Sequence, residues 1–461
     1  MAAAERRLEL RDIQALILDG FKDRPRARYA LLEIADPKAA RDWLKAAVER
    51  VTTAKQRHDA SGSRLNIAFT FKGLRELGLK QAYGFVAPFR EGMITERRST
   101  VLGDTGESAP ENWKWGNGSI HVLLLLYSKK ERLEDDWKGL EKDLGWVNKT
   151  NVRLIDAYLN PDSKEPFGFV DGISQPYIEG SNTSRRPTGD EARADVIKPG
   201  EFILGYLNEN DSLPVTPEID DALDPHEYLR TRPTRGRRDF GRNGTYLVLR
   251  QLHQDVTEFL RFLREQAKGD EAEAQRLAAK MVGRWYSGAP LVKAPDADRE
   301  ALAGDNDFGY HDSDPLGHSC PIGAHIRRAN PRDSVGDASR ATPERALAES
   351  RHHRLIRRGR VYGDEATGRG LMFLCLNANI ENQFEFVQNS WINSPRFGGL
   401  DGETDPLVGP RDATGEGPMT IQSAQGNRRL TGLARFVNVK GGDYFFLPGI
   451  RALQCLADLP D

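Results

Sequence analysis

Asp171 is the only charged residue of the stretch PFGFVDGISQP, residues 166–176. A carboxylate among apolar neighbours costs free energy unless it is paired, solvated or used in a reaction. One interpretation is an Asp-Gly turn, because Gly168 and Gly172 supply the backbone freedom that a sharp turn needs. The other is a general acid or base, because burial raises the pKa of a carboxyl group toward the working pH. This segment alone leaves both interpretations open.

His325 lies between two apolar residues in the stretch CPIGAHIRRANPRD, residues 320–333. A histidine in such company is commonly a hydrogen-bonded core residue. It can also bind a metal or a haem iron through its neutral imidazole. The arginines that follow it could hold the propionate groups of a haem: Arg327, Arg328 and Arg332.

Arg357 follows the apolar pair Leu355 and Ile356 in the stretch RHHRLIRRGRVYG, residues 351–363. Runs of charged residues usually form a solvated face or pair with acids. We expect this of most arginines in the run, and one of them could instead point inward. An inward cation would be a suitable neighbour for a functional carboxylate.

Cysteine usage argues against a disulfide framework. Cys320, Cys375 and Cys455 are few and scattered, which fits buried thiols in a reducing compartment. Zinc sites show paired short spacings, and these are missing from the densest group of potential ligands, His311, His318, Cys320 and His325.

Charge and hydropathy limit the partners that we expect. The 461 residues carry 66 Lys and Arg against 68 Asp and Glu, so nothing attracts nucleic acid or an anionic membrane globally. No apolar run approaches the roughly 18 residues of a membrane span, and the N-terminal stretch lacks an apolar signal region. We therefore predict a soluble cytoplasmic protein without a membrane partner. The basic cluster at 229–244 has almost no interleaved aromatics, so RNA binding is a weak alternative.

Regular elements must position these segments, and the first half of the chain predicts several. Apolar runs indicate strands, and apolar residues at helical spacing indicate helices. Asp36 and Pro37 supply a helix cap and a first helical position. The predicted order is strand 28–35, a helix after Pro37, strands 65–71 and 121–128, a helix over 133–144 and strand 151–159. This is a split βαβ, or ferredoxin-like, arrangement.

The second half repeats the pattern at greater length. It predicts strand 243–252, helices within 255–283, strand 371–377, a helix over 381–391 and strand 443–448. We therefore predict an α+β fold of two ferredoxin-like halves, each a four-stranded antiparallel sheet with helices. The predicted boundaries are an N-terminal half over 10–178, a linker or long loop over 179–200, and a C-terminal half over 201–461.

Taken together, the three segments resemble those of the dye-decolorizing peroxidases, a haem family. GFVDGISQP is similar to the G-x-x-D-G segment of the family, CPIGAHIRRANPRD to the segment of its proximal histidine, and RLIRRGRVYG to that of its distal arginine. Further similar segments are 198–206, 240–256, 370–393 and 435–453, so the resemblance runs from about Leu10 to Leu453. Length and N-terminus resemble the larger branches of the family without an export signal.

This resemblance implies that haem b binds in the second half of the chain. It implies that His325 is the axial ligand of the iron, Asp171 the distal acid and Arg357 the distal arginine. Arg357 is preferred to Arg358 because it lies two residues before Gly359.

Further residues match the resemblance in supporting positions. Leu371 and Phe373 would line the distal face of the haem, and Gly172 would let the backbone pass close to the macrocycle. The remaining candidates are Arg332 and Arg327 for the haem propionates, and Glu381 or Glu385 as the acid that orients the proximal imidazole.

The function implied is a peroxidase that reduces hydrogen peroxide and oxidises dyes, phenolic or other aromatic reductants one electron at a time. Asp171 would move the peroxide proton, and Arg357 would stabilise the charge that develops as the O–O bond breaks. Two alternatives stay open. One is a haem protein of the same fold for haem carriage or iron release, which needs His325 alone. The other is a non-haem α+β binding module.

Overall fold

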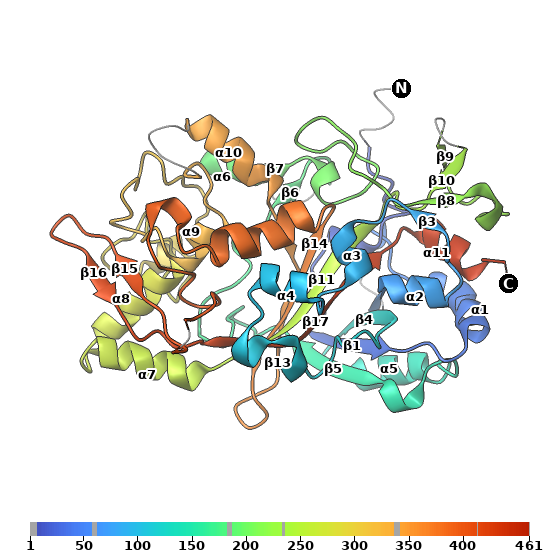
Figure 1. The fold of residues 1–461 in the computed structure, drawn as a ribbon, viewed down its shortest axis with the longest axis horizontal. Helices are drawn as coiled ribbons and strands as arrows, with labels where there is room; N and C mark the ends of the chain where they lie inside the picture. The colour runs from blue at the N-terminus through green and yellow to red at the C-terminus, as the bar shows by residue number, and fades with distance from the viewer. Residues whose placement is uncertain are drawn as a thin grey trace.

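Antiparallel strands from both halves of the chain form a barrel in the computed structural model, which describes residues 7–57, 62–181, 187–232, 236–335, 342–412 and 414–460 (Figure 1). In the first half, β1 lies between β4 and β5, and β4 pairs with β2. In the second half, β14 lies between β11 and the short strands β12 and β13, and β11 pairs with β17. The bounds of these strands are β1 Arg26–Leu32, β2 Arg64–Phe69, β4 Val122–Ser128, β5 Arg153–Tyr158, β11 Thr245–Gln254, β12 Ile356–Arg357, β13 Arg360–Tyr362, β14 Gly370–Asn377 and β17 Val437–Leu447.

The two sheets join at both edges. β17 pairs with β2 at Phe446 and Phe69, and β13 pairs with β5 at Tyr362 and Ala157. The predicted α+β class with an antiparallel sheet in each half is confirmed. The sequence did not predict that the sheets close into one barrel, because single-strand patterns carry no information about which edges meet.

Both faces of strand β4 are buried. Leu124 and Leu126 pack in the outer core beneath the helices, whereas Leu123 and Leu125 fill the interior of the barrel. Alternate side chains of a strand point to opposite faces, so two apolar faces need a continuous apolar run. This explains the unbroken run VLLLL in the sequence.

Helices of the first half cover one end of the barrel. In α1 (Pro37–Val48) the Asp36 side chain accepts a hydrogen bond from Ala39 N, so the predicted cap is confirmed. α1 packs against the C-terminal helix α11 (Ile450–Ala457), and both lie with α2 and α5 at one end of the molecule (Figure 1). The other helices here are α2 Phe71–Glu76, α3 Ala87–Glu91, α4 Glu96–Leu102 and α5 Leu133–Glu141.

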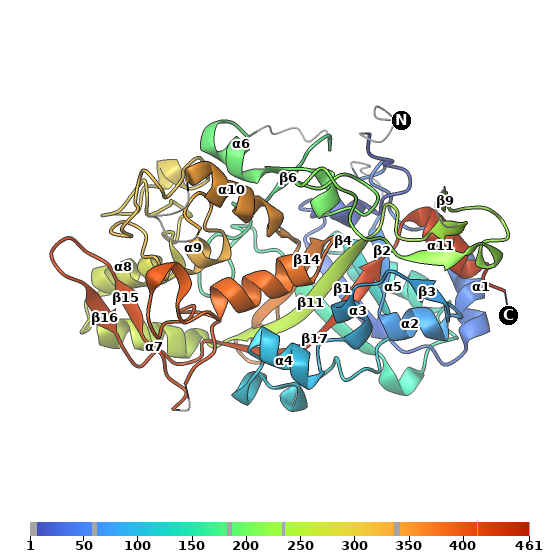
Figure 2. The ribbon, with the colours of Figure 1, turned by 45° about the horizontal axis from the view of Figure 1, so that its top comes forward.

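Apart from α11, the helices of the second half gather at the opposite end (Figure 2). α7 (Val256–Gln266) and α8 (Glu271–Val282) occupy the predicted range 255–283. The helix predicted over 381–391 is present as two π-helical segments, η9 (Glu381–Glu385) and η10 (Val387–Ile392). π-Helical turns are frequent at functional sites. The remaining helices are α6 Gly189–Asp195, α9 His325–Ala329 and α10 Pro343–His352.

Short elements decorate this frame. The stretch 179–200, predicted as a linker or long loop, contains α6 and part of a small parallel sheet, and its residues 182–186 lie outside the described residues. In the part of the chain that the structure describes, no helix is long and apolar enough to cross a membrane. The short strands are β3 Ala82–Tyr83, β6 Tyr177–Ile178, β7 Val196–Ile197, β8 Glu218–Asp220, β9 Thr231–Arg232, β10 Arg237–Asp239, β15 Met419–Ile421 and β16 Arg428–Leu430.

Candidate active site

A cavity of about 320 Å³ lies between the second-half sheet and the helices α8 and α9. Side chains of β11, β14 and β17 form one wall, and side chains of α8 and α9 form another. This volume falls within the roughly 300–1,000 Å³ that small-molecule and cofactor sites occupy. All three predicted segments contribute to the lining, with Asp171, His325 and Arg357.

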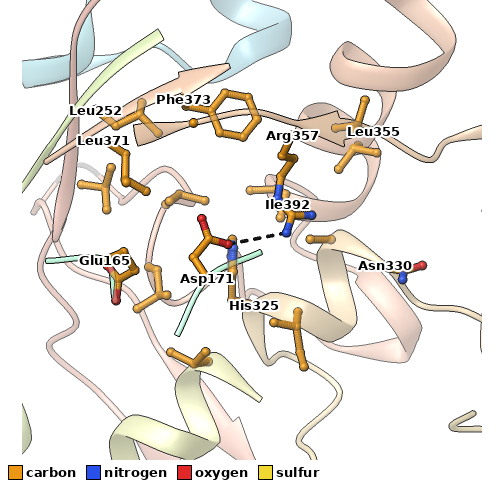
Figure 3. A pocket seen from close by; sticks show the side chains of 18 of the residues that line it. Glu165, Asp171, Leu252, His325, Asn330, Leu355, Arg357, Leu371, Phe373 and Ile392 are labelled. Atoms are coloured by element: carbon orange, nitrogen blue, oxygen red, sulfur yellow. Dashed lines mark ion pairs between the residues drawn. The ribbon is translucent and has the colours of Figure 1, made fainter. Parts of the chain in front are cut away.

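Asp171 and Arg357 meet at this cavity. Arg357 Nη2 lies 3.6 Å from Asp171 Oδ1, as the dashed line in Figure 3 marks. The Arg357 amide also donates to Gln175 Oε1 at 3.0 Å, which ties the strand to the segment that follows Asp171. The sequence signals for an inward arginine and for an unusual aspartate therefore belong to one site.

The Asp171 carboxylate is not buried, so this part of the sequence interpretation is wrong. Its side chain is 49% exposed, because the apolar neighbours pack away from it. The Phe167 ring lies 4.6 Å from Phe259, and the Phe169 ring stacks 4.3 Å from Tyr286. These contacts anchor the turn and leave the carboxylate directed into the cavity (Figure 3).

Arg358 faces away from the cavity. Its Nε and Nη2 donate to the carbonyl groups of Leu16 and Ile17, each at 3.0 Å. Burial lowers the pKa of Arg358 to about 10. Alternate residues of a strand point to opposite faces, which places Arg357 and not Arg358 at the cavity.

His325 begins helix α9 and is oriented by an aspartate. Its Nδ1 lies 2.9 Å from Oδ2 of Asp405, a fully buried side chain whose Oδ1 accepts from Leu407 N and Val408 N. Burial opposes protonation of His325, but the Asp405 carboxylate outweighs it and holds the pKa of His325 above its ordinary value. With Nδ1 engaged, Nε2 is the ring nitrogen left to bind a metal.

Glu381 and Glu385 do not contact His325, so the predicted choice between them is wrong. Both accept hydrogen bonds from Arg98, and Glu385 also accepts one from Tyr444 at 2.7 Å. Asp405 was missed because its stretch, ETDPLVGP, offers only an aspartate before a short apolar run. Sequence distance gives no indication that residue 405 reaches residue 325.

Buried arginines line the end of the cavity near α9. Arg332 is 2% exposed and donates to Asn306 Oδ1 and the Phe308 carbonyl. Arg284, which the sequence did not single out, is 6% exposed and donates to Asn306 Oδ1 and the Gly288 carbonyl. Burial lowers the pKa of Arg284 to about 10. Among the described residues neither guanidinium has a carboxylate partner, so both are available to acidic groups of a ligand.

Arg327 does not line the cavity, so its predicted contact with a propionate is wrong. Its guanidinium pairs with Asp314 at 3.3 Å, donates to the Cys320 carbonyl at 2.8 Å and lies over the Tyr310 ring. Side chains three or four residues apart share a face of a helix, and Arg327 is two residues from His325. It therefore leaves α9 on another side.

The lining fits a haem group. Leu371 and Phe373 of β14 form an apolar wall, and Gly172 lines the cavity without a side chain. His325 supplies a nitrogen ligand, and the buried arginines supply cations for propionates. Asn330 Nδ2 and Arg354 Nε are buried at the lining and have no hydrogen-bond partner among the described residues, as expected of atoms that face a polar ligand. Across the described ranges, no group of three or more His, Cys, Asp and Glu could hold a bare metal ion.

The basic cluster at 229–244 is engaged in ion pairs. Arg230 and Arg242 both pair with Glu9 at 2.6 Å, and Arg238 pairs with Glu227 at 3.1 Å. Residues 233–235 of the cluster lie outside the described residues. The arginines that can be placed are therefore balanced locally by acids.

Comparisons with known proteins show the family of this chain. Residues 12–146 match the family model of the DyP dimeric alpha+beta barrel domain. Peroxidase 2 of Mycetinis scorodonius is 30% identical, with 98% of this chain and 88% of the relative covered. A multifunctional dye peroxidase of Amycolatopsis sp. is 33% identical over 97% of this chain and 93% of its own. A solved dye-decolorizing peroxidase in complex with 2,6-dimethoxyphenol superposes with a TM-score of 0.79, at 26% identity over 98% of this chain and 100% of its own.

An α+β barrel with a cavity that His325 lines, together with these similarities, defines a peroxidase of the haem class. The chain belongs to the dye-decolorizing peroxidase family. It is therefore an enzyme, a peroxidase, and the predicted family is confirmed.

Proposed function

We propose that this peroxidase binds haem b, reduces hydrogen peroxide, and oxidises dyes, phenolic or other aromatic reductants one electron at a time, with Asp171 as acid/base and Arg357 as its cationic partner. One observation supports this proposal above all: the Asp171–Arg357 pair, at 3.6 Å, shares the cavity with His325. A carrier of haem would need the histidine, but it would have no use for an acid and a cation at this cavity.

His325 Nε2 would hold the haem iron, and Asp405 would fix the ring and its tautomer through Nδ1. Bound haem supplies the iron redox chemistry. Arg332 and Arg284 would bind the propionates, while Leu371 and Phe373 would cover the face of the macrocycle on the side of the sheet. None of the three cysteines lines the cavity, so we expect non-covalent haem b and no thioether link.

Asp171 and Arg357 divide the work on the peroxide. Asp171, as carboxylate, would take the proton from one peroxide oxygen and deliver it to the other, which would leave as water with the two electrons that bound haem would supply. Arg357 holds the peroxide and stabilises the negative charge that develops on the leaving oxygen. The ion pair with Arg357 holds the Asp171 carboxylate directed toward the cavity.

Phenolic reductants are part of the proposal because one relative of this chain has been solved in complex with 2,6-dimethoxyphenol. A phenol loses one electron and one proton, and two such steps complete the reduction of one peroxide. The three buried free thiols fit a reducing compartment, so we propose a cytoplasmic location.

Replacing Arg357 with Leu tests the proposal. We expect kcat/KM for hydrogen peroxide to fall about 10²- to 10³-fold, because a cation aimed at developing charge is lost. The Soret absorbance per protein should stay unchanged, since Arg357 does not ligate the iron. The exposed Arg396→Leu serves as the matched control. Unchanged turnover of Arg357→Leu with full haem content would overturn the assignment.

A further inference from the structure

Glu165 lines the same cavity, and no step of the proposed reaction uses it. Its Oε1 accepts a hydrogen bond from Phe169 N at 2.9 Å. Its Oε2 accepts from Phe167 N at 2.9 Å and from Gln254 Nε2 at 2.6 Å. Three donors thus converge on the two oxygens of one carboxyl group, and these hydrogen bonds offset part of the rise in the pKa of Glu165 that its burial causes.

These bonds lie inside the turn that carries Asp171. The Glu165 amide donates to the Phe169 carbonyl at 2.9 Å, and the Gly168 amide donates back to the Glu165 carbonyl at 2.8 Å. At the open end, the Asp171 amide donates to the Ser163 carbonyl at 3.0 Å. Residues 163–171 therefore form a tight hairpin, with the Glu165 carboxylate at its centre and Asp171 at its end.

A polar contact links the hairpin to strand β11 of the barrel. Gln254 is the last residue of β11, and its side-chain amide binds Glu165. Phe167 and Phe169 pack on Phe259 and Tyr286 on the helical side. Apolar contacts hold the position of the turn, but they do not define its angle to the sheet. The hydrogen bonds of Glu165 do, because they are directional.

We infer that Glu165 is a positioning residue, whose carboxylate holds the 163–171 hairpin closed against β11 and thereby aims Asp171 at Arg357. This inference rests on the proposed role of Asp171. Figure 3 shows Glu165 and Asp171 on the same side of the cavity, opposite Arg357. Glu165 acts through the backbone amides of Phe167 and Phe169 that it binds.

Hydrogen exchange tests the hairpin independently of activity. In Glu165→Gln the amide can accept from one backbone N–H only, and its NH₂ group opposes the other. We expect peptides spanning 163–172 to exchange at least about tenfold faster, while peptides of β1 and β4 stay unchanged. Asp162→Asn is the matched control, because this exposed acid binds only the Lys164 amide of the same segment.

Kinetics test the consequence for Asp171. We expect Glu165→Gln to lower kcat/KM for hydrogen peroxide roughly 10- to 100-fold, with haem content and KM for the reductant unchanged. In an Asp171→Asn background the same substitution should change the rate less than twofold, because a residue that acts through Asp171 has nothing left to aim. Gln254→Met, which removes one of the three bonds, should give a smaller loss and serves if Glu165→Gln fails to fold.

Different results would overturn the positioning role of Glu165 and the proposed role of Asp171. Unchanged exchange in residues 163–172 of Glu165→Gln, or an equal rate loss in the Asp171→Asn background, would overturn the role of Glu165. Full activity of Asp171→Asn alone would instead overturn the proposed function, whatever the exchange shows.

Discussion

Arg357 and Arg358 are neighbours in the chain, yet one lines the cavity and the other binds the carbonyl groups of Leu16 and Ile17. Their roles cannot be exchanged, because the alternation of a strand separates them onto two faces. Asp405 is also held by specific contacts. One carboxylate oxygen contacts His325, and the other accepts hydrogen bonds from two backbone amides. The orientation of each of these three charged side chains is therefore set by specific partners.

Asp405→Asn should raise the reduction potential of the haem iron and lower peroxidase activity about 10- to 100-fold. A neutral amide draws less electron density toward the imidazole than a carboxylate does, so His325 becomes a weaker donor to the iron. A spectroelectrochemical titration measures the potential. Asp401→Asn, an exposed neighbour, is the control, and an unchanged potential in Asp405→Asn would contradict the assigned role.

Peroxidase activity should persist at acidic pH. A carboxylate base works wherever it is ionised, and aspartate has a reference pKa of about 3.9 against about 6.5 for an imidazole base. A pH profile of kcat/KM for hydrogen peroxide measures this. A profile that peaks only above pH 8 would count against a carboxylate as the proton carrier.

Strand β17 contains a buried acidic residue, Asp443, close to an irregularity in its pairing. Its register against β11 shifts between Gln251 and Leu252, and a Cβ atom on Gly441 would lie 2.4 Å from Trp115 Nε1. Asp443 follows two residues later. Burial raises the pKa of Asp443 to about 7, although it accepts a hydrogen bond from the Tyr444 amide.

Asp443→Asn should therefore stabilise the protein at neutral and alkaline pH. Between about pH 4 and pH 7 the folded state keeps a proton that the unfolded state releases, so stability falls as pH rises through this window. The amide removes that penalty while its oxygen still accepts from Tyr444. We expect a gain of at least about 1 kcal/mol at pH 8, below an upper bound of about 4 kcal/mol, and none at pH 4.

Denaturant unfolding of the holoenzyme at both values of pH measures the effect. The exposed Asp135→Asn controls for the loss of one negative charge. An equal gain at pH 4 and pH 8 would exclude titration as the cause.

Elements were predicted better than contacts. The strands β1, β2, β4, β5, β11 and β14 and the cap of α1 follow from local patterns, since apolar runs and Asp-Pro pairs act within a few residues. The sequence identified those site residues that lie in a recognisable local pattern or in a segment that resembles the family. Asp405 and Arg284 carry neither, because their importance comes from contacts across many residues. The prediction for Arg327 was wrong for the opposite reason. It rested on the closeness of Arg327 to His325 in the sequence.

At the scale of the whole molecule, the cavity lies between the barrel and the helical end of the second half, while the hairpin of Asp171 comes from the first half. Ligand binding in such a place adds contacts between segments that lie far apart in the sequence. The first-half strands β1 and β4, by contrast, are packed on both faces by protein alone.

Removing haem should consequently loosen the protein locally. A ligand that binds only the folded state stabilises it by about 2.7 kcal/mol at a concentration one hundred times its Kd, so the apoprotein should melt earlier. We expect hydrogen exchange to rise in residues 163–172 and 320–335, which line the cavity, and to stay unchanged in β1 and β4. Uniform acceleration along the chain would contradict this picture.

The pairing of β13 with β5 has a consequence for assembly of the enzyme. Arg357 is four residues before Val361, which lies opposite Tyr158, and the hairpin of Asp171 begins five residues after Tyr158. The pairing of β13 with β5 therefore sets the spacing between Asp171 and Arg357. A slip of one residue along it would turn Arg357 to the other face of its strand. A molecule with that error could still bind haem through His325 and yet fail to react with peroxide. Haem absorbance alone is therefore a poor measure of correct folding.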